Sequence, residues 1–185
     1  MKLILSLSLT ISFAAGLFAQ TPNASVIFDK QIGNVEGEVV SLAEAMPADK
    51  YNFAPTQGAF TGVRTFEQEV KHIAFTLNMV SNAMLDRPAP QGSGTAENGP
   101  DSIKGKDAAV KYLKDAFAQA HKAVATLNNN NLLQETADPF NPKGKRTRVD
   151  SAGILSWHTF DHYGQMVEYA RMNGVIPPAS QPARK

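Results

Sequence analysis

The sequence contains no cysteine and only four histidines among its 185 residues. The absence of cysteine excludes disulfides, thiolate nucleophiles and thiolate metal ligands, so any metal must be held by histidine, aspartate or glutamate. Neither sign of charge dominates, because 18 basic residues stand against 17 acidic ones and the net charge is +1. Such a chain has no overall field to attract nucleic acid or an anionic membrane. We therefore expect a small-molecule substrate and no nucleic-acid partner.

A hydrophobic run is found at the N-terminus. Lys2 precedes an apolar segment at 3–18, and Ala19-Gln20 offers a cleavage point, a pattern that is typical of a secretory signal peptide. We predict a signal peptide at 1–19 and one mature domain at 20–185. The protein is then exported, to the periplasm or the cell exterior, with no stable membrane span after cleavage. The alternative is that the leader is kept as an N-terminal anchor.

Apolar residues recur at helical spacing in four segments of the mature chain, and strand-like alternation is absent. The predicted helices are 24–46, 66–84, 107–128 and 151–173. Loops that contain proline and glycine join them, and two of these loops are long. Four amphipathic helices in a chain of this size predict an all-α fold, a four-helix bundle with two long crossover loops.

The last predicted helix carries the most informative pattern. Ser151 is its predicted N-cap, and Gly174 lies where a helix favours a left-handed residue at its end. His158 and His162 are one turn apart on the same face, so their imidazoles can chelate one divalent metal. The alternative is a pair of ordinary histidines. A buried imidazole needs a polar partner, however, and a metal supplies one partner to both rings.

The other two histidines also lie on predicted helices. His72 lies on the flank of the apolar face of the second helix, near Gln68 and Glu69 on the helix surface. His121 lies at the edge of the apolar face of the third helix. Taken alone, each is interpreted as an ordinary histidine at the boundary of the core.

A second apolar face, opposite the histidines, is formed on the last helix by Phe160, Tyr163 and Val167. A helix that is apolar on two sides is buried on two sides. We expect this second face to pack against another helix or against a second subunit, which would make the protein a homodimer.

The placement of three of the histidines resembles that of a known family. The segments Phe66–Ala74 in the second helix and His158–Gln165 in the last one resemble the DinB-like superfamily of damage-inducible and YfiT-like four-helix-bundle proteins. The segment Tyr169–Ser180 is also similar to the end of these proteins. The resemblance covers about residues 24–180, and its specificity lies in three histidines and the Gly-Gln pair at 164–165.

The resemblance implies a divalent metal held by His72, His158 and His162. Zinc or nickel is expected rather than magnesium, because the ligands are nitrogen atoms. The polar residues expected around these ligands are Gln68, Glu69 and Gln165.

The resemblance also implies a class of activity. Some relatives transfer low-molecular-weight thiols, and others are regarded as metal-dependent hydrolases, so we expect one of these two reactions. The His-Glu-x-x-His protease motif is absent, and an exported protein would meet little reduced thiol, which counts against the transferase. The alternative is a helical bundle that binds a metal or ligand, or forms a structural dimer, without turnover.

Overall fold

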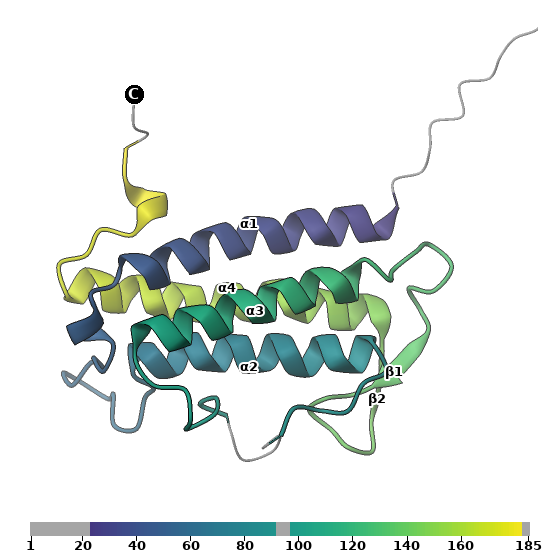
Figure 1. Ribbon diagram of the computed structural model, residues 1–185, viewed down its shortest axis with the longest axis horizontal. Helices are drawn as coiled ribbons and strands as arrows, with labels where there is room; N and C mark the ends of the chain where they lie inside the picture. Colours follow the sequence, from purple (N-terminus) through teal and green to yellow (C-terminus); the bar gives the residue numbers. More distant parts are fainter. Residues whose placement is uncertain (1–22, 92–96, 183–185) are drawn as a thin grey trace, which may run out of the picture.

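The computed structural model describes residues 23–91 and 97–182. Within these ranges the chain forms four long helices, which are α1 (Ala24–Ala45), α2 (Phe66–Met84), α3 (Lys106–Val124) and α4 (Arg148–Met172). The helices run side by side, with α1 and α2 on opposite sides and α3 and α4 between them (Figure 1). The prediction of an all-α four-helix bundle is therefore confirmed. The predicted signal peptide at 1–19 lies outside the described residues.

The core lies between the inner faces of the helices. Helix α2 packs against α3 and α4, and α1 packs against the same two neighbours. Each helix contributes buried apolar residues, for example Val35, Leu77, Leu113 and Ile154. This arrangement places α2 directly beside α4, which are the two helices that carry the three predicted ligands. None of the helices in the described part of the chain is long and apolar enough to cross a membrane.

The bounds of α2 and α3 can be traced to their terminal residues. Thr65 and Gln68 form a reciprocal capping box at the start of α2, as the sequence indicates. Helix α3 ends at Val124, earlier than the predicted end at 128. The reason is that Thr126 and Leu127 donate to carbonyls in a tightened turn. Leu127 still packs into the core, which explains its place in the apolar pattern.

The start of α4 differs most from the prediction. Two short strands, β1 (Glu135–Ala137) and β2 (Lys145–Thr147), form an antiparallel hairpin that leads directly into α4. Thr147 is the N-cap and accepts a hydrogen bond from Asp150 N, so the prediction of Ser151 as N-cap is wrong. The hairpin was not predicted from the sequence, which shows no strand-like alternation. Each strand has only 3 residues, too few to reveal an alternating pattern.

The second apolar face of α4 is only partly covered. Tyr163 and Val167 are half-buried and pack against the core. Phe160 remains 42% exposed, so the expectation that the whole face is buried is wrong at this residue. The physical reason is that α4 packs mainly against α1 and α2, which leaves part of its circumference outside the bundle.

Candidate metal centre

Three histidines from neighbouring helices converge at one point of the bundle. His72 comes from α2, and His158 and His162 come from adjacent turns of α4. The ring centroids are 5.1 Å apart for His72 and His158, 4.4 Å for His72 and His162, and 4.6 Å for His158 and His162. One nitrogen from each ring lies within 4.8 Å of the other two. The structure thus brings together all three residues that the sequence and the resemblance suggested as ligands.

The orientation of His72 is set by a backbone carbonyl. Its Nδ1 donates a hydrogen bond to the carbonyl oxygen of Glu97, which has no proton to offer in return. The lone pair of the ring therefore lies on Nε2, which faces His158 Nε2 at 3.3 Å. Two nitrogen lone pairs at this separation repel each other unless a proton or a cation lies between them. His72 is thus oriented as a metal-binding histidine is, with its second nitrogen held by the protein.

The carbonyl of Glu97 is held in place by the loop that follows it. The ammonium of Lys71, buried on α2, donates to Pro100 O at 3.4 Å and to Ile103 O at 3.1 Å. Gly99 has a φ of +74° and lies so close to Lys71 that an added Cβ would be 2.5 Å from Lys71 Cβ. The loop is therefore packed tightly onto the same helix that carries His72.

The orientation of His162 is set by a buried carboxylate. Its Nδ1 lies 2.7 Å from Glu69 Oε2, and the side chains of the two residues are only 8% and 2% exposed. The amide of Gln165 also approaches this nitrogen, at 3.4 Å. A carboxylate bound to Nδ1 leaves the Nε2 lone pair free to bind a cation and increases its basicity. Glu69 is therefore engaged as the partner of His162 and is not a free base.

The remaining polar residue expected near the site is used elsewhere. The side-chain oxygen of Gln68 accepts from Thr65 N at 2.8 Å, in the capping box at the start of α2. Of the three residues expected around the ligands, Glu69 and Gln165 thus contact a site histidine, and Gln68 is engaged in helix capping.

Burial keeps two of the site histidines neutral. It lowers the pKa of His158 to about 3, and electrostatic repulsion from the neighbouring His162, His72 and Arg64 acts in the same direction. Burial also lowers the pKa of His72, against the opposing effect of its hydrogen bond to Glu97 O. Neutral imidazoles at physiological pH offer lone pairs to a cation without first losing a proton.

A cavity opens beside the histidines. Its volume is about 340 Å³, and the residues that line it include His72, His158, Arg64, Phe75 and Phe140. Arg64 and Phe140 escaped the sequence analysis because they lie in loops, where no periodic pattern marks a residue as functional. The signal in the sequence that could have indicated Arg64 is its position, as a basic loop residue immediately before the capping box of α2.

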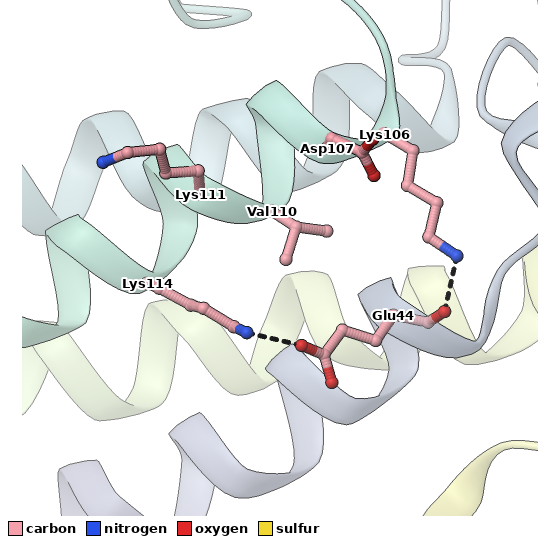
Figure 2. Close-up of a pocket in the computed structure, with 6 residues that line it drawn as sticks. All are labelled: Glu44, Lys106, Asp107, Val110, Lys111 and Lys114. Carbon is pink, nitrogen blue, oxygen red and sulfur yellow. Dashed lines mark hydrogen bonds and ion pairs between the residues drawn. The ribbon is translucent and has the colours of Figure 1, made fainter.

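A second cavity between α1 and α3 is unrelated to this site. Its volume is about 400 Å³ and its lining includes Lys106, Lys111, Lys114 and Glu44. Figure 2 shows the ammonium groups of Lys106 and Lys114 directed at Glu44, at 2.6 Å from its carbonyl and 2.5 Å from its carboxylate. Lys114 is paired with the Glu44 carboxylate, Lys111 with Asp115, and Lys106 donates to a backbone carbonyl, so the ammonium groups of this cavity are engaged within the protein.

His121 lies apart from the three histidines, as interpreted from the sequence. Its Nδ1 contacts Asp29 Oδ1 at 2.6 Å and its Nε2 contacts Glu36 Oε2 at 3.0 Å, so it bridges α3 to two carboxylates of α1. Burial lowers its pKa, but the hydrogen bonds and charges of Asp29 and Glu36 outweigh that effect and the net shift is upward. Both nitrogens are engaged with acidic partners, which is the arrangement of a protonated structural histidine.

Comparison with known proteins agrees with this architecture. A family model described as the DinB superfamily matches residues 31–166. Among solved structures, the chain is similar to a DinB-like protein of Bacillus subtilis, YjoA, with a TM-score of 0.61 and 18% sequence identity. This similarity covers 85% of the present chain and 99% of the other, and at that identity it concerns the fold. No curated protein matches the chain.

Proposed function

The chain belongs to the DinB superfamily, and from that premise we propose that it is an exported metal-dependent enzyme. In this proposal His72, His158 and His162 bind one divalent metal, zinc or nickel, and the reaction is hydrolysis or the transfer of a thiol to a small molecule. The observation that carries the proposal is the convergence of three imidazoles whose ligand nitrogens lie within 4.8 Å of one another.

The chemistry of the donor atoms fits a borderline transition metal. Neutral imidazole suits zinc and nickel, whereas magnesium prefers oxygen ligands. Two of the rings have their outward nitrogen fixed, by Glu97 O for His72 and by Glu69 for His162. Partners of this kind orient the ligating nitrogen and are typical of metal-binding histidines.

The protein's own residues supply the orientation of the ligands. A divalent cation with three protein ligands and an open position lowers the pKa of a bound water or thiol, which activates it as a nucleophile. Glu69 holds His162 in place and balances part of the positive charge. Since Glu69 is only 1% exposed and engaged with His162, we assign it this positioning role. The amide nitrogen of Gln165 lies beside the same His162 nitrogen, whose proton is already donated to Glu69, so we assign the orienting role to Glu69 alone.

The experiment that tests the proposal is metal analysis of the natively purified protein. We expect about one equivalent of zinc or nickel per chain in the wild type and in His121→Ala. We expect His158→Ala to lose stoichiometric metal, because two imidazoles alone bind far more weakly than three. Equal metal content in His158→Ala and His121→Ala would overturn the proposal and leave a structural helical bundle.

The two reactions are distinguished with the metal-loaded protein. Hydrolysis of an activated ester in the absence of thiol supports the hydrolase, and conjugation of a small thiol to chlorodinitrobenzene supports the transferase. The control in both assays is metal-loaded protein treated with a chelator. Failure of both reactions in a protein with one equivalent of metal would favour the non-catalytic binding bundle.

Export is a separate part of the proposal. It is supported by the order of Lys2, an apolar segment and Ala19 in the sequence. Intact-mass measurement of the protein from its native host tests it. A mature chain that starts near Gln20 is expected, and a full-length chain embedded in a membrane would contradict the prediction.

A further inference from the structure

The cavity beside the histidines has a cationic side and an apolar side. Arg64 lies in the loop before α2 and lines the cavity together with His72 and His158. The apolar side is formed by Phe75 and Met79 of α2 and by Phe140 of the loop between β1 and β2. A single guanidinium facing apolar walls suits a ligand that is anionic at one end and apolar at the other.

Arg64 is held at the cavity without being neutralised. Its Nε donates to Asn98 Oδ1 at 2.9 Å, and its backbone carbonyl accepts from the hydroxyl of Tyr169 on α4 at 3.2 Å. Its carboxylate neighbour among the described residues is Glu97, at 3.9 Å from Nη2, and that side chain is 83% exposed. A guanidinium has five N–H donors in a planar fork, so donors remain for the two oxygens of a carboxylate.

The charges around the cavity also favour an anion. The guanidinium of Arg64 belongs to a residue that lines the same cavity as His72 and His158. The proposed metal would add two positive charges to that of Arg64. Two carboxylates oppose them, the buried Glu69, which faces His162, and the exposed Glu97, which also lines the cavity, so one positive charge remains. The cavity is therefore positive in its functional state, and a neutral or cationic ligand would leave this charge uncompensated.

We propose that the substrate is a small carboxylate with an apolar body, bound with its carboxylate on Arg64 and its body against Phe75, Met79 and Phe140. This inference rests on the proposed function, because it assigns the substrate of the same site. The apolar body has room to extend. A further cavity of about 300 Å³ shares Met79, Pro139 and Phe140 with the first, and continues along α2 to Ala83.

The test uses octanoate as the probe and zinc-loaded protein from which free zinc has been removed. Binding is measured by isothermal titration calorimetry, and the zinc content of every sample is measured in parallel. Acetate serves as the ligand with the same charge and no apolar body, and octylammonium as the ligand with the same body and the opposite charge. We expect octanoate to bind at least about a hundredfold more tightly than acetate, because its methylene groups are buried. Octylammonium is expected not to bind measurably.

Variants locate the two halves of the ligand. Arg64→Gln should weaken octanoate binding about tenfold to hundredfold, the range for loss of a charge-assisted hydrogen bond, and Arg64→Lys should weaken it less. The matched control is Arg171→Gln, which removes one positive charge from the exposed last turn of α4 and should leave affinity within about twofold. Phe140→Ala should weaken octanoate binding and leave acetate binding unchanged. Circular dichroism checks that each variant is folded.

The outcomes separate the two proposals. If wild-type protein binds neither zinc nor nickel stoichiometrically, the metal site fails and the assigned substrate fails with it. If zinc is bound stoichiometrically but octanoate binds equally well to Arg64→Gln and the wild type, the substrate assignment alone is overturned. Equal affinities for octanoate and octylammonium would overturn it in the same way. Because Phe140 lies in a loop and is 50% exposed, Phe140→Ala tests the apolar half even if an Arg64 variant is unstable.

Discussion

The chain's four histidines occupy two environments that differ in almost every physical respect. Between α2 and α4, three imidazoles face one another, and the outward nitrogens of two of them, His72 and His162, are fixed by Glu97 O and Glu69. Between α1 and α3, His121 lies alone with a carboxylate on each nitrogen. The first arrangement disfavours protonation at His72 and His158, and the second favours it. Imidazoles arranged to stay neutral are suited to a cation, whereas an imidazole arranged to be protonated is suited to an ion pair.

The comparison teaches that the partner of a histidine is more informative than the histidine itself. His72 and His121 both lie at the edge of an apolar helix face, and the sequence alone does not separate them. In the folded chain, His72 meets other imidazoles and a backbone carbonyl, and His121 meets Asp29 and Glu36. Changing the partners should therefore affect the two regions in different ways, and the following predictions are ordered by the size of the expected effect.

The largest effect is expected from Glu69→Ala. The substitution removes the carboxylate that holds His162 Nδ1 at 2.7 Å and leaves a buried imidazole N–H without its acceptor. Metal affinity should fall about tenfold to hundredfold, and the free energy of unfolding should fall by about 1–3 kcal/mol. Competition with a chromophoric chelator and urea denaturation measure the two quantities. The matched control is Glu36→Ala, which removes a partner of His121 and should leave metal affinity unchanged.

The next effect is expected from Gly99→Ala. A Cβ at this position would lie 2.5 Å from Lys71 Cβ, and the φ of +74° already disfavours any residue with a side chain. Strain of this kind costs about 1–3 kcal/mol. The loop should move and take the carbonyl of Glu97 away from His72, so metal affinity should fall together with stability. Gly105→Ala is the control, because its φ is +81° but its Cβ would meet nothing within 4 Å. Equal metal affinity in the two variants would show that the loop does not orient His72.

The two environments should also respond to pH in opposite directions. The pKa of His158 is about 3 in the folded chain against an ordinary value of 6.5, so the unfolded chain binds the extra proton between these values. The free energy of unfolding of the metal-free protein should therefore fall as the pH drops below about 6.5. The pKa of His121 is raised in the folded chain. Its contribution to the free energy of unfolding is therefore fully present below the pKa of the unfolded chain, and it is lost as the pH rises through the pKa of the folded chain.

Urea denaturation of metal-free protein between pH 4 and pH 9 measures this difference. The variant His158→Gln should lose less stability at acidic pH than the wild type. The variant His121→Gln should be less stable than the wild type at acidic pH. The two should be equally stable at alkaline pH, where the wild-type ring is neutral. The same pH profile in both variants would show that the two environments do not differ in the direction described.

Much of the metal centre follows from helical spacing. His158 and His162 had to share a face of a helix, because they are four residues apart, and Glu69 had to lie one turn from His72. That His72 faces the other pair depends on α2 packing beside α4, and this came from the resemblance to a family rather than from the residues of the helix. Amphipathic patterns indicate which face of a helix is buried, but they do not name the neighbouring helix.

The parts that escaped prediction lie in loops or in the backbone. The carbonyl of Glu97 orients His72, yet a backbone carbonyl carries no side-chain signal. Arg64 and Phe140 enter the cavity from loops without periodicity. The hairpin β1–β2 was missed because strands of 3 residues have no visible alternation. The start of α4 at Arg148, which follows the hairpin directly, was missed for the same reason. Helix bounds are the least certain feature of a sequence-based prediction, since terminal turns respond to tertiary contacts.

The smallest effect is expected from His121→Gln. The ring lies between Asp29 and Glu36 near the surface, with its side chain 30% exposed, and ion pairs of this kind contribute about 0.2–1 kcal/mol. At pH 6 the melting temperature should therefore fall by no more than about 2–4 °C. High salt should reduce the difference, because solvent screens exposed charges. Metal content should remain equal to that of the wild type. If His121→Gln lost metal to the extent expected for His158→Ala, the two environments would be coupled. That result would contradict their separation between different pairs of helices.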